Sequence, residues 1–228
     1  VLFRSLLPVM AIVKQPDLGT SILVFASGFF VLFLAGLRKR YLIGTALGVV
    51  AAIPMLWVYV MLDYQKQRVL TLLSPEDDKY GAGWNIIQST TAIGSGGLMG
   101  KGWTQGTQSQ LNFLPESHTD FIIAVLAEEF GLVGVIILCG LYLILIAQCM
   151  IIAINAQSQF GRLIAGSMAL TFFTYVFVNM CMVSGLLPVV GVPLPLISYG
   201  GTAIVTLFFG FGILMAISSE PKQLRTRL

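Results

Sequence analysis

Residues 18–37 read LGTSILVFASGFFVLFLAGL and contain no charged side chain. A helix that crosses the hydrocarbon core of a bilayer needs about 20 apolar residues, so this stretch predicts a transmembrane helix. Four further segments are also apolar and free of charge, namely residues 41–62, 130–154, 163–183 and 196–218. Residues 1–13 are typical of the end of one more helix. The chain is therefore predicted to be an all-α, polytopic integral membrane protein, a helical bundle that forms a single transmembrane domain over residues 1–228.

The composition excludes an ordinary soluble domain. Hydrophobic residues make up 57% of the 228 residues, charged residues only 10%, and the mean hydropathy is +0.89. Soluble domains carry about 25% charged residues. With one histidine and no Cys-x-x-Cys sequence, no dedicated metal site is expected, and no nucleic-acid partner is expected either. The chain opens at Val1 inside an apolar run, which indicates the C-terminal part of a longer protein.

The cations predict the orientation in the membrane, because loops rich in Lys and Arg stay in the cytoplasm. Three alternate connections are marked by such cations, namely residues 38–40, Arg162 and the tail that contains Lys222, Arg225 and Arg227. The other side then receives residues 14–17, the long segment 63–119 and the Pro-rich segment 184–195. Residues 63–119 are thus predicted to be the large loop outside the cytoplasm.

The segment 63–119 is predicted to carry structure of its own, as long functional loops usually do. A weak amphipathic pattern from Trp84 to Ile93 predicts a helix in the membrane interface. A glycine-rich stretch, Gly94 to Gly106, follows it and is incomplete as a phosphate-binding P-loop. The favoured interpretation is a flexible loop with positive-φ turns. The alternative is a cradle of backbone amides that faces an anionic ligand together with Lys101.

The run LNFLPESHTDF, residues 111–121, stands directly before an apolar span and holds the only histidine, His118, with the carboxylates Glu116 and Asp120. Polar groups at the mouth of a membrane bundle are costly and by default indicate a site. Two interpretations of Asp120 stay open: a first-turn residue in a capping box that begins at Ser117, or a general base. His118 is expected chiefly to hydrogen-bond within the loop, with catalysis as the alternative.

Four further residues are candidates by their charge and position. Glu128 follows Asp120 by about two helical turns, so the two acids are predicted to share a helix face turned toward protein or water. Asp17 is predicted either to cap the first uncharged span or to form half of an ion pair. Arg68 and Lys101 are the cations best placed to meet an anionic substrate, although a solvated position is the default for each.

Four motifs, in this order along the chain, resemble the SEDS family, which includes RodA and FtsW. They are QPDLGT at residues 15–20, LPESHTDF at 114–121, EEFG at 128–131 and PLPLISYGG at 193–201. The QPDL sequence and the segment VSGLLPVVGVP, residues 183–193, are more similar to RodA, the elongation member, than to FtsW. The family fold is a ten-helix bundle with both ends cytoplasmic. The resemblance implies that this chain runs from the end of the fifth helix to the tenth, with residues 63–119 as the large periplasmic loop of an inner-membrane protein.

The resemblance implies a membrane glycosyltransferase of cell-wall synthesis. Such an enzyme polymerises lipid II into glycan strands during cell elongation and releases undecaprenyl pyrophosphate. The resemblance assigns Asp120 as the catalytic carboxylate, and a carboxylate there suits a general base. The substrate-binding residues would be the polar groups near this motif and in the large loop, namely Arg68, Lys101, Glu116, His118 and Glu128. The leaving pyrophosphate needs positive charge, from these cations or from a divalent cation, Mg2+ or Mn2+, and no other cofactor is implied.

The implied partners are lipid II as substrate, the surrounding membrane lipid and a class B penicillin-binding protein, a transpeptidase with one membrane helix. Two alternatives stay open. One is a lipid II flippase, because transporters also use intramembrane acids and broken helices. The other is a non-catalytic scaffold that positions the transpeptidase. A transporter would place its polar residues near the middle of the membrane, whereas here they cluster at one surface, which favours the enzyme.

Overall fold

The computed structural model describes residues 2–15, 17–78, 81–110 and 117–220. Every regular element in these ranges is a helix, which confirms the predicted all-α bundle. In chain order the elements are α1 (Leu2–Val13), α2 (Leu18–Leu34), α3 (Lys39–Met55), the π-helix η1 (Leu56–Val60), α4 (Asp63–Leu73), the 3-10 helix η2 (Pro75–Asp77), α5 (Ala82–Gly96), α6 (Thr107–Gln110), α7 (Ile122–Asn155), α8 (Gln159–Val183) and α9 (Gly201–Ser218). The predicted substrate residue Glu116 and the basic tail at 222–227 lie outside the described residues.

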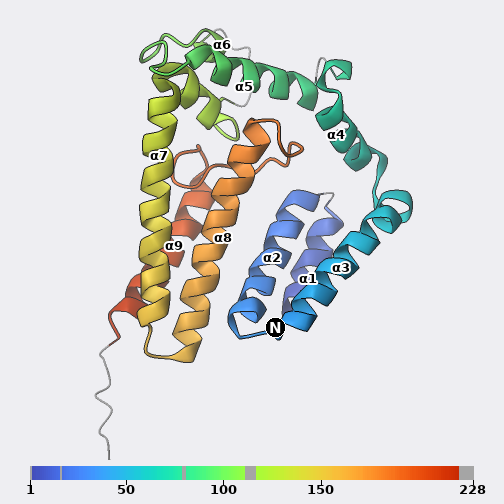
Figure 1. Cartoon of the computed structure of the whole chain (residues 1–228), viewed down its shortest axis with the longest axis vertical. Helices are drawn as coiled ribbons and strands as arrows, with labels where there is room; N and C mark the ends of the chain where they lie inside the picture. Colours follow the sequence, from blue (N-terminus) through green and yellow to red (C-terminus); the bar gives the residue numbers. More distant parts are fainter. Residues whose placement is uncertain (1, 16, 79–80, 111–116, 221–228) are drawn as a thin grey trace, which may run out of the picture.

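The helices form two groups that meet between α2 and α8 (Figure 1). α7, α8 and α9 stand together in one group, α1, α2 and α3 form the other, and α4, α5 and α6 lie across one end. The two groups approach closely at Gly166 of α8, where an added side chain would meet Leu34 of α2. The α2–α3 and α7–α8 connections lie at the end opposite to α4–α6. This alternation agrees with the predicted arrangement of the loops.

The apolar helices correspond to the predicted spans, with corrected starting points. Within the described residues, four helices are long and apolar enough to cross a membrane, and α2 is a shorter apolar helix. α7 begins at Ile122 instead of Phe130, because the two acids near its start are buried in protein and need not avoid the span. α9 begins at Gly201 instead of Leu196, because Leu196 has a left-handed φ of 69°, which does not continue into a helix.

α5 confirms the predicted helix in the large loop, and one of its faces is docked on the bundle. The residues on this face recur every three or four positions and are small or apolar, namely Gly83, Ile86, Ser89, Ala92 and Gly96. The Ser89 hydroxyl donates to the Val183 carbonyl at the end of α8, at 2.9 Å. A side chain on Gly96 would overlap the Ala127 carbonyl of α7. Close packing of small residues therefore fixes α5 against both α7 and α8.

α7 is interrupted near its start at Gly131, whose φ of 67° and ψ of −162° are not helical. In a regular α-helix each amide donates to the carbonyl four residues earlier. The interruption therefore takes the amides of Leu132 and Val133 away from the carbonyls of Glu128 and Glu129. Four backbone groups must find other partners, because an unpaired buried group is costly.

The glycine loop, residues 97–106, supplies all four partners. The two released amides donate to the carbonyls of Gly97 and Leu98, at 3.0 and 3.2 Å. The two released carbonyls accept from the amides of Lys101 and Gly102, both at 3.0 Å. Three glycines of the loop have positive φ, as the sequence predicted. The loop and the start of α7 therefore complete each other's hydrogen bonding.

This arrangement predicts that Gly131→Ala destabilises the protein. An alanine would be strained at this φ, and its methyl group would overlap the Gly100 amide and the Leu98 carbonyl. We expect the free energy of unfolding to fall by about 2–4 kcal/mol. Gly140→Ala is the matched control, because a side chain there meets nothing within 4 Å and Ala favours a helix over Gly by about 1 kcal/mol. Thermal unfolding followed by circular dichroism measures both variants, and an unchanged midpoint for Gly131→Ala would contradict the arrangement.

Candidate active site at one end of the bundle

Residues 117–121, called here the motif turn, precede α7, and the predicted capping box is wrong. α7 begins at Ile122 with Phe121 as its N-cap residue, and no side chain accepts a capping hydrogen bond there. Ser117 is buried, and Asp120 lies before the helix instead of in its first turn. The turn does not continue α7 backwards because its backbone carbonyls are bound by other parts of the fold.

Those partners come from α8 and from the α8–α9 segment, residues 184–200. The carbonyls of residues 118–120 are bound one after another. The Tyr199 amide donates to the first at 2.9 Å, and the Ser198 hydroxyl donates to the second while it accepts from the Leu194 amide at 2.7 Å. Nδ2 of Asn179 donates to the third at 2.8 Å. The motif turn is therefore fixed by three consecutive bonds.

The side chain of Asp120 is half-buried and lies against Gly191. Its Oδ2 is 3.5 Å from the position that a Cβ would take on Gly191, and Gly191 has a φ of +79°. Only glycine adopts this conformation freely, and a Cβ at this position would be in van der Waals contact with the carboxylate. The catalytic candidate therefore sits at the junction of the motif turn and the α8–α9 segment.

A cavity of about 860 Å³ opens next to this junction, between α2, α8, α9 and the α8–α9 segment. Gly191 and Ser198 are part of its wall, so the cavity borders residues that contact the motif turn. The wall is mostly apolar, with hydroxyl groups from residues such as Thr20 and Tyr175. Its volume lies within the usual range for small-molecule sites.

Arg68 reaches the same end of the molecule from α4. Its Nη1 donates to the Val189 carbonyl at 3.3 Å, close in the chain to Gly191. The side chain is exposed, and a guanidinium has five N–H donors. His118 is also exposed, and its backbone carbonyl binds Tyr199. A substrate contact by either side chain stays a prediction.

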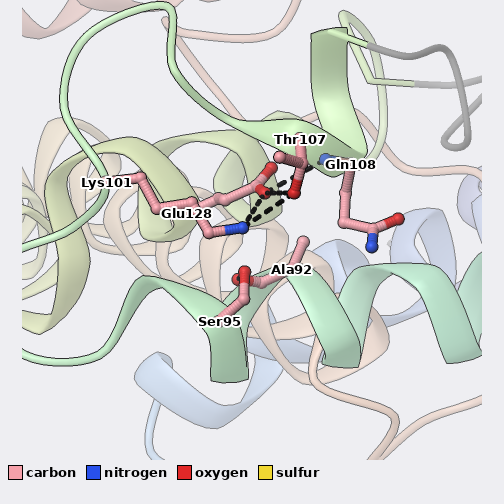
Figure 2. Close-up of polar contacts among 6 residues, drawn as sticks. All are labelled: Ala92, Ser95, Lys101, Thr107, Gln108 and Glu128. Carbon is pink, nitrogen blue, oxygen red and sulfur yellow. Dashed lines mark hydrogen bonds and ion pairs between the residues drawn. The ribbon is translucent and has the colours of Figure 1, made fainter.

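Lys101 and Glu128 bind each other (Figure 2). The ammonium lies 2.8 Å from Oε1 of Glu128, which is fully buried, while Lys101 is 27% exposed. The same oxygen accepts from the Thr107 hydroxyl at 3.1 Å and from the Gln108 amide at 3.0 Å. Asp120 lies outside α7, so the predicted common helix face of the two acids is wrong. Glu128 instead fastens the glycine loop and α6 to α7, and substrate contact by this pair stays a prediction.

The alternative of an anion-binding cradle in the glycine loop is wrong for the amides of Gly100, Lys101 and Gly102. These amides donate to backbone carbonyls at 2.8, 3.0 and 3.0 Å. The Lys101 ammonium also donates to the Thr107 hydroxyl at 2.8 Å. These donors therefore serve the fold itself.

Asp17 is the N-cap residue of α2. Its Oδ1 accepts from the Thr20 amide at 3.0 Å, which is the first of the two roles that the sequence left open. Two residues further on, Gly19 packs directly on Val190, where any side chain would overlap. The capped end of α2 therefore abuts the α8–α9 segment.

Asn179 is a site residue that the sequence analysis missed. It is fully buried in α8, and its Nδ2 donates to the carbonyls of Asp120 and Val192 at 2.8 and 2.6 Å. The available signal was its isolation, because it is the only Asn, Gln or charged residue in the span 163–183. A polar group within an apolar span indicates a role by default.

Within the described residues, no group of three or more His, Cys, Asp or Glu side chains is placed to hold a metal ion. A divalent cation at this end of the bundle stays a prediction.

A family of cell cycle proteins, which groups FtsW, RodA and SpoVE, matches residues 1–223. The chain is 63% identical over 219 residues to the peptidoglycan glycosyltransferase MrdB of Escherichia coli K12, which covers 96% of this chain and 59% of that protein. Among solved structures, the chain is similar to one from a peptidoglycan synthase complex that coordinates polymerization and crosslinking. The TM-score is 0.80 and the identity 31%, over 96% of this chain and 60% of that one.

A second solved structure is the rod shape-determining protein RodA of Thermus thermophilus, with a TM-score of 0.63 and 27% identity over 96% of this chain and 55% of that one. The chain belongs to the FtsW/RodA/SpoVE family, the SEDS family that its four motifs resemble. It spans 59% of the length of the Escherichia coli relative.

The ion pair between Lys101 and Glu128 predicts that removing one partner lowers the free energy of unfolding more than removing both. Lys101→Met leaves the Glu128 carboxylate buried with one partner fewer, so we expect a loss of about 3 kcal/mol in the free energy of unfolding. The double variant Lys101→Met/Glu128→Leu leaves no buried charge at position 128 and should be more stable than Lys101→Met alone. Lys66→Met in α4 serves as the control for removing a lysine from the same large loop. Thermal unfolding compares the wild type, both single variants Lys101→Met and Glu128→Leu, the double variant and Lys66→Met. Additive losses for Lys101→Met and Glu128→Leu would contradict the pairing.

Proposed function

We propose that the protein is a peptidoglycan glycosyltransferase that polymerises lipid II into glycan strands during cell elongation. The observation that carries the proposal is the carboxylate of Asp120, whose backbone is held at one end of the bundle beside a cavity with mostly apolar walls. The proposal is supported by the 63% identity to a peptidoglycan glycosyltransferase. Because the chain spans 59% of that relative, the activity is proposed for the whole protein.

In this proposal Asp120 acts as the general base. An acceptor sugar hydroxyl attacks the anomeric carbon of the donor, a new glycosidic bond forms, and the bond to the lipid pyrophosphate breaks. The hydroxyl must lose its proton as it attacks, and a positioned carboxylate can take that proton. Three consecutive bonds to residues 118–120 support this role, because a general base needs a fixed position relative to the reacting atoms.

The leaving undecaprenyl pyrophosphate develops negative charge that cations can stabilise. Arg68 is the better placed of the two predicted cations, because α4 brings it to the α8–α9 segment and its side chain is exposed. Lys101 would have to share its ammonium with Glu128. A divalent cation that arrives with the pyrophosphate is a further proposed source of positive charge. His118 and Glu116 would complete the polar surface around the sugars.

The cavity beside Gly191 suits the lipid part of the substrate. Its walls are mostly apolar, and it opens among helices that have the length and composition of membrane spans. A polyprenyl chain placed there would hold the sugars and the pyrophosphate near Asp120.

We further propose that the protein lies in the bacterial inner membrane with this end toward the periplasm. The proposed partner is a class B penicillin-binding protein, because a similar structure comes from a synthase complex that couples polymerization to crosslinking. The polymerase would supply the strands that such a transpeptidase crosslinks.

The proposal predicts that Asp120→Asn in the full-length protein abolishes glycan-chain formation. The amide keeps the size of the side chain but takes no proton, so a loss of at least about 100-fold is expected. The control is Asp77→Asn, which changes an exposed acid in η2 and should leave activity unchanged. The measurement uses labelled lipid II and the protein purified with its transpeptidase.

The possible outcomes separate the three functional hypotheses. Chains from the wild type and from Asp77→Asn, but not from Asp120→Asn, support the base assignment. Equal chains from all three move the base to another residue. If no chains form while a known polymerase works in the same assay, the flippase and scaffold alternatives replace the enzyme.

A further inference from the structure

Asn179 binds two separate parts of the site with one side-chain amide. It is fully buried, and its Nδ2 donates to the Asp120 carbonyl at 2.8 Å and to the Val192 carbonyl at 2.6 Å. Both partners are acceptors only, so the nitrogen, and not the oxygen, must face them. The two N–H groups of the amide are therefore fully used.

The oxygen of the same amide has no such partner. Oδ1 of Asn179 is buried and makes no hydrogen bond within the described structure. An unsatisfied buried polar atom costs about 1–3 kcal/mol. Local choices that cost stability are expected chiefly at functional sites. The presence of Asn179 is therefore better explained by the two carbonyls that its nitrogen binds than by a contribution to the stability of the core.

The two carbonyls flank the carboxylate of Asp120. The first belongs to Asp120 itself, and the second belongs to Val192, the neighbour of Gly191. Gly191 lies against Oδ2, 3.5 Å from its would-be Cβ. One amide on a rigid helix thus sets both the backbone that carries the carboxylate and the surface against which it rests.

We propose that Asn179 is a positioning residue for Asp120. This inference rests on the proposed function, because Asn179 acts through the general base and does not itself touch substrate. Without it, the motif turn and the α8–α9 segment lose their common anchor, and the carboxylate moves relative to the acceptor hydroxyl. A misplacement of about 1 Å can cost about 100-fold in rate.

The test compares two substitutions in the full-length protein with its transpeptidase. Asn179→Leu keeps the branched shape of the side chain without the amide, and Asn179→Ala is a second variant in case the larger Leu does not pack. Thr174→Val is the matched control in α8, because its hydroxyl bonds only to the Leu170 carbonyl of its own helix. Asp120→Asn is measured alongside as the reference for loss of the base.

For either Asn179 variant, kcat for glycan-chain formation is expected to fall about 10- to 100-fold, with KM for lipid II within about twofold of wild type. Partial unfolding of a variant would also lower the measured kcat, because less of the protein would be active. The folded fraction of each variant is therefore measured by its binding to the transpeptidase, and kcat is calculated for that fraction. Thr174→Val should match the wild type in both constants.

A second measurement does not depend on activity. The Tyr199 amide donates to His118 across the junction that Asn179 anchors. Amide hydrogen exchange of the peptide that contains Tyr199 is therefore expected to become faster in the Asn179 variants and to stay unchanged in Thr174→Val. The C-terminal half of α7 serves as an internal standard that should not change.

The outcomes distinguish this inference from the proposed function. If an Asn179 variant retains wild-type kcat while Asp120→Asn is inactive, the positioning role is overturned and the proposed function stands. Unchanged hydrogen exchange at Tyr199, or an equal loss in Thr174→Val, also overturns it. If the wild type forms no chains in a validated assay, the proposed function fails and the positioning role fails with it.

Discussion

A backbone amide or carbonyl without a hydrogen-bond partner costs several kcal/mol in an apolar environment. This constraint determines how the end of the bundle near α4, α5 and α6 is built. The interruption of α7 at Gly131 would leave two amides and two carbonyls unpaired. The glycine loop pairs with all four. The Lys101–Glu128 contact and the docking of α5 support this pairing, because they hold the glycine loop where these bonds can form. The large loop is therefore a part of the folded bundle and not an appendage.

The same constraint explains the motif turn. Its residues do not join α7, so their carbonyls need donors from elsewhere, and α8 and the α8–α9 segment provide them. The α8–α9 segment also contacts α2 through Gly19 and α4 through Arg68. Elements far apart in the sequence thus converge on Asp120. Such convergence suits the proposed general base, since many independent bonds restrict the position of its backbone more than any single contact does.

The sequence allowed much of the fold to be predicted, because hydrophobic length and the distribution of charge depend on the membrane and not on the details of packing. The spans were predicted in this way, and the helix within 63–119 from its amphipathic pattern. The cap at Asp17 was one of two roles that the sequence left open. Other features depend on contacts between distant segments. Ser117 looked like the start of a capping box, and only the bonds from Ser198, Tyr199 and Asn179 explain why it is not. Likewise, the partner of Glu128 could not be identified from spacing, because Lys101 reaches it through a loop whose path is set by backbone bonds.

The shared bonds between the glycine loop and α7 also impose an order on biosynthesis. The part of α7 from Leu132 to Asn155 rises about 36 Å at 1.5 Å per residue, so it can enter a bilayer of about 30 Å as an ordinary span. The residues before Leu132 include Glu128 and Glu129, whose backbone carbonyls need hydrogen bonds from the glycine loop. The glycine loop is synthesised before α7 and has to stay outside the membrane until α7 is in place. The motif turn needs donors from α8 and from the α8–α9 segment, which are synthesised after α7. The site is therefore assembled only after both segments have reached the same side of the membrane, and a partly inserted chain carries no finished site.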